Sequence, residues 1–228
     1  LSVKGGTFDL HQKWEGSSMY LFNCIDEAYV DGSANVAISG GTFVGFDPNV
    51  SPEQKVDGKV PSFAAPGVGI TKNENGSFTA VDGMTAQILD EDGNSVNAYN
   101  TLAEAVAAAQ NGQTITLLAD VEQNTQLAID KSITLDLNGK TIKNTVDIWG
   151  DNTNAILSIK DGAKVTITGN GTIDAKENDC YTINVVKGDL TIENGTFYGN
   201  VSVVQVEEGT LSVKGGTFDL HQKWEGSS

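Results

Sequence analysis

One short phrase recurs five times along this chain and constrains its fold more than any other feature. It consists of an alternating apolar triplet, a bend that contains glycine or asparagine, and then threonine followed by isoleucine or phenylalanine. The phrase occupies residues 35–46, 132–144, 164–175, 189–200 and 210–221. Alternation with a period of two predicts strands with one buried face. Glycine and asparagine suit the corner because they adopt positive φ readily.

A further apolar run precedes most of these phrases, for example "MYLF" (19–22), "AILSI" (155–159) and "YTINVV" (181–186). One coil therefore runs strand, turn, strand, bend, strand, and the loops between the coils differ in length. Coils stacked about 4.8 Å apart would satisfy each other's backbone groups and bury a continuous apolar ladder. The sequence thus predicts an all-β solenoid. A β-sandwich is the alternative, but its turns recur every ~8–12 residues and would not repeat one phrase five times.

Three segments predict how the coils begin and end. In "NTLAEAVAAAQNG" (100–112), Thr101 and Glu104 have capping-box spacing and Asn111-Gly112 stops a helix. This short helix would cap the first coil, since an open strand edge invites aggregation. "GVGITKNENGSFTAVDG" (67–83) predicts a hairpin-like ending, and "AQILDEDGNSVNA" (86–98) predicts a second pair of strands joined by a turn.

The first eighteen residues, "LSVKGGTFDLHQKWEGSS", return unchanged as residues 211–228. The natural order of one unit is therefore 83–228 followed by 19–82, with a period of about 210 residues. We expect residues 1–82 to hold the terminal coils and hairpin-like ending of one unit. Residues 83–228 would hold the capping helix and first coils of the next unit, or of the same unit in permuted order. The sequence then represents an excerpt of a tandem array, with any secretion signal or anchor outside it.

Composition restricts the partners. The chain has 14 lysines, no arginine and 30 acidic residues, which gives a formal net charge of −16. Such a field repels phosphate backbones, and arginine is the favoured bidentate ligand of phosphate and guanine, so no nucleic-acid partner is expected. No apolar run approaches the ~18 residues that span a bilayer, so no membrane insertion is expected. Strong acidity with few aromatic residues indicates a solvated extracellular surface; an acidic cytosolic protein is the alternative.

The segment "TLAEAVAAAQNGQTITLLADVEQNTQLAIDKSITLDLNGKTI", with the later "GNGTID", "ENGTF", "GGTF" and "ITKNENGSFTAVDG", resembles the right-handed parallel β-helix regions, pectin-lyase-like in fold, of large bacterial surface proteins. "NCIDEAYVDGSANVAISGGTFVGFDPN" is similar to segments of bacteriophage fibre proteins. The resemblance covers nearly the whole chain. It implies a right-handed parallel β-helix with a short N-terminal capping helix, at a cell or virion surface, in a structural or adhesive role. Because the fold also hosts lyases and hydrolases, it does not specify function.

The resemblance also implies a test for catalysis. Lyases of this fold use Asp-bound Ca²⁺ with an arginine base, and its hydrolases carry Gly-His-Gly and Arg-x-Lys signatures; neither pattern occurs here. His11 and His221 are two copies of one position, and the nearest carboxylates along the chain are Asp9/Asp219 and Glu15/Glu225. A catalytic site needs convergent groups. We therefore predict no catalytic residue, no cofactor-binding residue and no enzyme activity.

Two further patterns are candidates for ligand contact. Asp90, Asp92 and Asn94 alternate as in the first half of a calcium loop, but the closing Glu is replaced by Thr101, and the residues favour an ordinary hairpin turn over a calcium loop. Calcium is thus the one cofactor candidate. The second pattern is a set of three tryptophans in polar loops that would stack on sugar rings or else cover an apolar coil edge: Trp14, Trp149 and Trp224.

The two cysteines, Cys24 and Cys180, imply no disulfide framework, and Cys24 is expected to pack as a small apolar residue. The sequence as a whole predicts a non-catalytic structural or adhesive repeat unit of an extracellular bacterial surface protein. Head-to-tail neighbours of the same kind, assembled through coil complementation, are the expected partners, together with a host or bacterial glycan or protein. The alternatives are a bacteriophage fibre or tail component and a polysaccharide-degrading β-helix enzyme.

Overall fold

The computed structural model describes residues 1–10, 21–22, 24, 26–50, 62–148, 150, 154–176 and 181–221. Strands dominate these residues, and most of the strand pairs are parallel, which confirms the all-β prediction. The chain divides into two compact units, Leu1–Asn100 and Thr101–Ser228.

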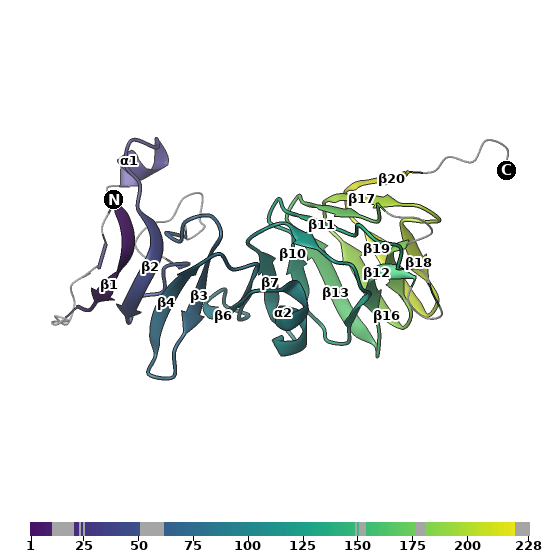
Figure 1. Ribbon diagram of the computed structural model, residues 1–228, viewed down its shortest axis with the longest axis horizontal. Helices are drawn as coiled ribbons and strands as arrows, with labels where there is room; N and C mark the ends of the chain where they lie inside the picture. Colours follow the sequence, from purple (N-terminus) through teal and green to yellow (C-terminus); the bar gives the residue numbers. More distant parts are fainter. Residues whose placement is uncertain are drawn as a thin grey trace. The chain divides into compact units, whose positions relative to one another are not determined.

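In the second unit, every third strand in chain order joins the same parallel sheet. The strands of each of the three sheets therefore follow one another from teal to yellow in Figure 1. The first sheet contains β7 (Thr114–Leu117), β10 (Thr134–Asp136), β13 (Ala163–Thr168), β16 (Gly188–Ile192) and β19 (Gly209–Val213). The second contains β8 (Val121–Glu122), β11 (Thr141–Lys143), β14 (Thr172–Asp174), β17 (Thr196–Gly199) and β20 (Thr217–Leu220). The third contains β9 (Leu127–Ile129), β12 (Ala155–Ile159), β15 (Tyr181–Val185) and β18 (Val204–Val206).

The recurring phrase sets the register between these strands. Leu135 lies beside Ile167, and Ile167 lies beside Ile192. After the bend, Ile173 lies beside Phe197. All of these side chains are buried. Because a slip of one residue would turn every apolar side chain to the opposite face, the alternating pattern itself holds this register.

Helix α2 (Leu102–Ala108) precedes β7 and is capped as the sequence predicts. Thr101 Oγ1 accepts a hydrogen bond from the Glu104 amide at 3.1 Å, and Glu104 Oε2 accepts one from the Thr101 amide at 3.1 Å. The helix ends at Ala108, earlier than Asn111-Gly112, because Ala109 is already extended, at φ −59° and ψ 150°. Lys131 Nζ donates to the Ala107 carbonyl at 2.8 Å and satisfies one of the free carbonyls at that end.

The first unit contains a four-stranded mixed sheet. β1 (Ser2–Phe8) pairs in parallel with β2 (Ala37–Val44), β2 pairs antiparallel with β4 (Ser77–Asp82), and β4 pairs antiparallel with β3 (Val68–Lys72). The hairpin predicted over 67–83 is therefore confirmed, and its strand β4 lies against β2.

The second predicted pair of strands is also present, as the antiparallel hairpin β5 (Ala86–Leu89) and β6 (Ser95–Tyr99). This hairpin, which the sequence groups with residues 83–228, belongs to the first compact unit.

One predicted strand of the first unit is wrong. "MYLF" (19–22) was expected to form a strand, but Leu21 and Phe22 lie in a bend, and helix α1 (Asp26–Val30) follows shortly after. Residues 19–20 lie outside the described part of the chain. The physical reason is packing, because the bend places the Phe22 ring among other aromatic rings, 5.4 Å from Phe8 and 5.7 Å from Phe46.

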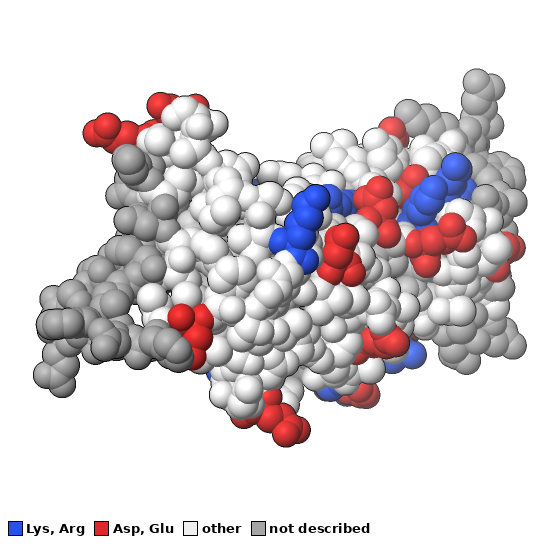
Figure 2. All heavy atoms as spheres, turned by 60° about the vertical axis from the view of Figure 1, so that its left-hand side comes forward, with Lys and Arg blue, Asp and Glu red and all other residues white. Residues whose placement is uncertain are grey.

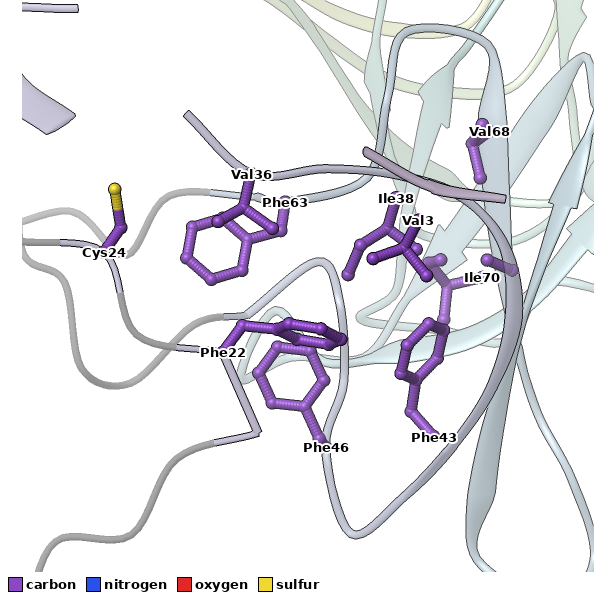
Figure 3. Packing of buried hydrophobic residues seen from close by; sticks show 11 residues of the cluster. Val3, Phe22, Cys24, Val36, Ile38, Phe43, Phe46, Phe63, Val68 and Ile70 are labelled. Atoms are coloured by element: carbon purple, nitrogen blue, oxygen red, sulfur yellow. The ribbon is translucent and has the colours of Figure 1, made fainter. Parts of the chain in front are cut away.

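The core of the first unit is rich in phenylalanine (Figure 3). The Phe43 ring stacks on that of Phe8 at 5.3 Å and meets that of Phe46 edge-on at 6.0 Å. Val3 of β1 packs beside Ile38 of β2 in this cluster. Residues 1–8 therefore complete the core of the first unit, rather than forming a separate arm.

Candidate functional site

The last strands of the second unit leave part of their apolar ladder open. Leu211 and Val213 of β19 are 40% and 51% exposed, and Phe218 of β20 is 38% exposed. The residues that pair with them on β16 and β17 are fully buried: Leu190, Ile192 and Phe197. The exposure thus comes from position in the sheet, because within the described part of the chain β19 and β20 pair with another strand on one edge only. Open edges of this kind are templates for pairing with another strand.

The first copy of the same sequence has a neighbour on the opposite edge. Val3, which corresponds to Val213, is 6% exposed and pairs with Ile38. Phe8, which corresponds to Phe218, stacks on Phe43 with an interplanar angle of 8°. The same sequence is therefore covered on one edge by β16 and β17 in the second unit, and on its other edge by β2 in the first unit.

Glycine makes the close approach of β1 to β2 possible. A Cβ on Gly40 would lie 2.5 Å from the Lys4 carbonyl oxygen, and a Cβ on Gly41 would lie 3.0 Å from that of Gly6. Gly41 also has φ of +118°, which other residues rarely adopt. The paired glycines of the phrase are thus needed where β2 lies against β1.

A histidine and a carboxylate meet on the outer face of the second sheet. His221 Nε2 lies 2.6 Å from Asp174 Oδ1, and the imidazole stacks on the Tyr198 ring at 5.3 Å. Tyr198 lies on β17, the strand between β14 and β20. It pairs with Asp174 of β14 on one side and with Asp219 of β20 on the other. Sequence reasoning sought a partner for His221 among near neighbours in the chain and missed Asp174, which stacking brings close across 47 residues. The pair links strands that are not adjacent in the sheet.

The predicted calcium pattern forms the turn of the β5–β6 hairpin. Asp90 Oδ1 accepts hydrogen bonds from the amides of Asp92, at 3.1 Å, and Asn94, at 2.8 Å. Burial opposes ionisation of Asp90, but the hydrogen bonds from Asn94 and Asp92 outweigh it and hold its pKa below the usual value. These contacts engage the carboxylate in closing the turn. Within the described ranges, no group of three or more His, Cys, Asp or Glu side chains is placed to hold a metal ion.

Several predicted residues lie outside the described part of the chain: Trp14, Trp149, Trp224, His11, Glu15, Glu225 and Cys180. The tryptophan candidates for glycan contact therefore stay predictions. Cys24 is described, and it is buried in the phenylalanine-rich cluster of the first unit as expected (Figure 3).

Asp47 is a buried carboxylate that sequence reasoning did not single out. Its oxygens accept hydrogen bonds from the Ser95 amide at 2.7 Å, the Ser95 hydroxyl at 3.0 Å and the Asn49 amide at 2.9 Å. Burial raises the pKa of Asp47 above its usual value in spite of these hydrogen bonds. The contacts tie the segment after β2 to the start of β6, so the role they support is structural.

A shallow hollow of about 360 Å³ lies over β8 and β11, lined by Asp120, Val121, Glu122, Thr141 and Lys143. At its edge, hydrogen bonds from Thr145 and Asn124 hold the pKa of Glu122 below its usual value. The hollow is open, and its lining mixes charged and hydroxyl groups with apolar surface, so it specifies no class of ligand.

In the centre and right of the face shown in Figure 2, basic and acidic side chains lie next to one another, whereas the acidic groups at its left stand in small separate clusters. Several pairs join successive coils: Lys187 Nζ lies 3.1 Å from Glu208, and Lys214 Nζ lies 3.4 Å from Glu193. Exposed pairs of this kind contribute about 0–1 kcal/mol each.

Among the described residues, no helix combines the length and the apolar character needed to cross a membrane. Comparison of the chain with protein-family models, with curated proteins and with solved structures found no match. The resemblance to bacterial surface β-helices therefore stays a prediction, and function is argued from the geometry of the chain.

Proposed function

We propose that residues 101–228 form a right-handed parallel β-helix capped by α2, and that the chain is a repeat unit of a structural or adhesive stalk. The observation that carries this proposal is the register, in which corresponding residues of the recurring phrase lie side by side in successive coils. A stack of this kind grows by adding coils, so it suits a rigid spacer.

The ends of the chain support a tandem array. Residues 1–8 lie against β2, and the identical residues 211–218 follow β18 in the second unit. A unit that runs from 83 to 228 and then from 19 to 82 would pass through this shared coil once per period of about 210 residues. The stacking contacts on both edges of the shared sequence are the ones that such a continuous array requires.

An extracellular location at a bacterial surface, with a glycan or protein as ligand, is part of the same proposal. Its support is the formal net charge of −16 and the resemblance of the coil phrases to bacterial surface β-helices. A non-catalytic role is proposed because His221 and Asp174 bridge coils and the Asp90 carboxylate closes a turn. These polar groups are engaged in holding the fold together.

The array is tested by adding one period, with residues 19–228 appended after Ser228. The particle is expected to lengthen by the same increment for each added period, as measured by small-angle X-ray scattering. An unchanged maximum dimension would contradict the proposal. The non-catalytic role is tested separately, by incubating the chain with acidic and neutral glycans. No new reducing ends are expected, and their steady release would show an enzyme.

A further inference from the structure

The same eight residues occur in this chain in two environments, as 1–8 and as 211–218, and together these define a docking site. Residues 1–8 have β2 on one edge, whereas residues 211–218 have β16 and β17 on the other edge. The edge that β2 covers in the first copy is the edge that no described residue pairs with in the second. The open edge therefore has a partner whose geometry is already visible in the chain.

We propose that the open end formed by β19 and β20 binds β2 of a second copy of this chain, in the place that β1 occupies. The inference rests on the proposed stalk function and identifies the partner and the interface. β1 then acts as an intramolecular plug. It occupies the edge of β2 until β19 and β20 of another copy displace it.

The expected register follows from the β1–β2 pairing. Ser2 pairs with Ala37, Val3 with Ile38, Thr7 with Thr42 and Phe8 with Phe43. In the complex, the corresponding pairs between copies are Ser212–Ala37, Val213–Ile38, Thr217–Thr42 and Phe218–Phe43.

Backbone groups support the same register. The Leu1 carbonyl accepts a hydrogen bond from the Ala37 amide at 2.9 Å, and the Val3 carbonyl accepts one from the Ser39 hydroxyl at 3.3 Å. Leu211 and Val213 carry the corresponding carbonyls on the open end. Addition of a strand to an exposed sheet edge uses such main-chain bonds for affinity and side-chain pockets for specificity. Here Phe218 would stack on the Phe43 ring, as Phe8 does in the first unit.

The exchange would cover the side chains that the stack leaves open. Val213 is 51% exposed, and Val3 in the same pairing with β2 is 6% exposed. Phe218 already stacks on Phe197 at 5.2 Å, so docking would place it between two phenylalanine rings. Displacement of β1 exposes Val3 and Phe8 in return, so burial at about 25 cal/mol per Å² favours association only where the β2 edge is already free.

β1 and residues 212–218 offer β2 identical side chains, so the exchange replaces each interaction with β2 by an equivalent one. A segment within the same chain acts at an effective concentration of about 1 mM. At about 10 μM protein, β1 therefore outcompetes a second copy roughly 100-fold. The intact chain is expected to be mainly monomeric at that concentration and to associate near the millimolar range.

The identical copies supply a matched pair of variants. Val3→Ser with Phe8→Ser weakens the plug and leaves the open end intact, and it should lower the concentration for association about 100-fold. Val213→Ser with Phe218→Ser makes the same changes in the other copy and should abolish association. Sedimentation velocity over a concentration series measures both, with circular dichroism to show that each variant is folded.

If the Val3/Phe8 variant does not fold, a chain that lacks residues 1–10 serves as the second test, with a peptide of residues 1–10 as competitor. The peptide is expected to suppress association by refilling the β2 edge. Association that persists in the Val213/Phe218 variant, or in excess peptide, would overturn the proposal.

Register is tested by disulfide formation between Thr42→Cys and Thr217→Cys chains with weakened plugs. Neighbouring strands of a sheet bring Cα atoms within the range of about 4.4–6.8 Å that a disulfide spans. A cross-linked dimer that needs both variants is expected. In a chain carrying both cysteines, a cross-link within the monomer would show that the occupant is the chain's own β2 and would overturn docking of a second copy.

The outcomes for the docking site and for the stalk are distinguishable. If an appended period lengthens the particle but no variant associates, the stalk proposal is supported and the docking site is contradicted. Association that depends on Val213 and Phe218, with no lengthening by an appended period, leaves the docking site and removes the stalk.

Discussion

Phe218 lies stacked on Phe197, with ring centroids 5.2 Å apart and an interplanar angle of 13°. The relationship repeats in the first unit between Phe8 and Phe43, at 5.3 Å and 8°. One position of the recurring phrase thus stacks its rings across neighbouring parallel strands. Offset stacking of aromatic rings adds about 0.5–1.5 kcal/mol to the stabilisation from burial.

Truncation of Phe197 and truncation of Phe218 should lower the free energy of unfolding by different amounts. Phe197→Ala is expected to lower the free energy of unfolding by about 3–5 kcal/mol, since Phe197 is fully buried. Phe218→Ala should cost no more than about 2 kcal/mol, because its ring is 38% exposed and burial free energy scales with area. Guanidinium unfolding followed by circular dichroism measures both. Equal losses would contradict the difference in packing.

A side chain at position 40 should destabilise the chain, whereas a side chain at position 5 should be tolerated. A Cβ on Gly40 would lie 2.5 Å from the Lys4 carbonyl oxygen, while nothing lies within 4 Å of a Cβ on Gly5. Gly40→Ala is therefore expected to cost about 1–3 kcal/mol by forcing β1 away from β2. Gly5→Ala should be neutral or stabilising by up to about 1 kcal/mol. Hydrogen exchange on β1 measures the loosening, and equal protection in the two variants would count against the stacked arrangement.

The capping box at α2 should be measurable on its own. Thr101→Ala removes the acceptor for the Glu104 amide and is expected to cost about 1 kcal/mol of unfolding free energy. Thr101→Ser keeps the hydroxyl and is the matched control. Urea unfolding of both variants is the measurement, and a Ser variant as unstable as the Ala variant would exclude the hydrogen bond as the cause.

Asp47 should make stability fall as pH rises. Burial raises its pKa in the folded chain above the ordinary value of 3.8, so the folded state holds the proton more tightly than the unfolded state. Its contribution is then greatest below pH 3.8 and is lost as pH rises through the raised folded pKa. In Asp47→Asn this dependence should vanish, so the unfolding free energy of the original chain relative to the variant falls above pH 3.8.

Asp90→Asn is the control for this prediction, because the folded pKa of Asp90 is lowered. The stability that Asp90 contributes is present above pH 3.8 and is lost as pH falls through its lowered folded pKa. Chemical unfolding between about pH 2 and 7 compares the two variants. Parallel pH profiles for the two would contradict the opposite directions of the shifts.

The sequence by itself determined the elements that depend on local pattern. Alternating triplets predicted the strands around Leu135, Ile167 and Ile192, and threonine and glutamate at capping-box spacing predicted the start of α2. These features depend on period-two burial and on hydrogen bonds a few residues apart, both of which are visible in a short window.

Only the tertiary structure decided which distant groups meet. It placed Asp174 beside His221, buried Asp47 against Ser95, turned the segment around Phe22 away from a strand, and set residues 1–8 on β2. Each of these contacts spans many residues, and its free energy depends on how loops of uneven length bring coils together. The identical ends show this most clearly: Val3 is buried and Val213 is exposed, because burial is a property of the neighbours that the stack supplies and not of the residue.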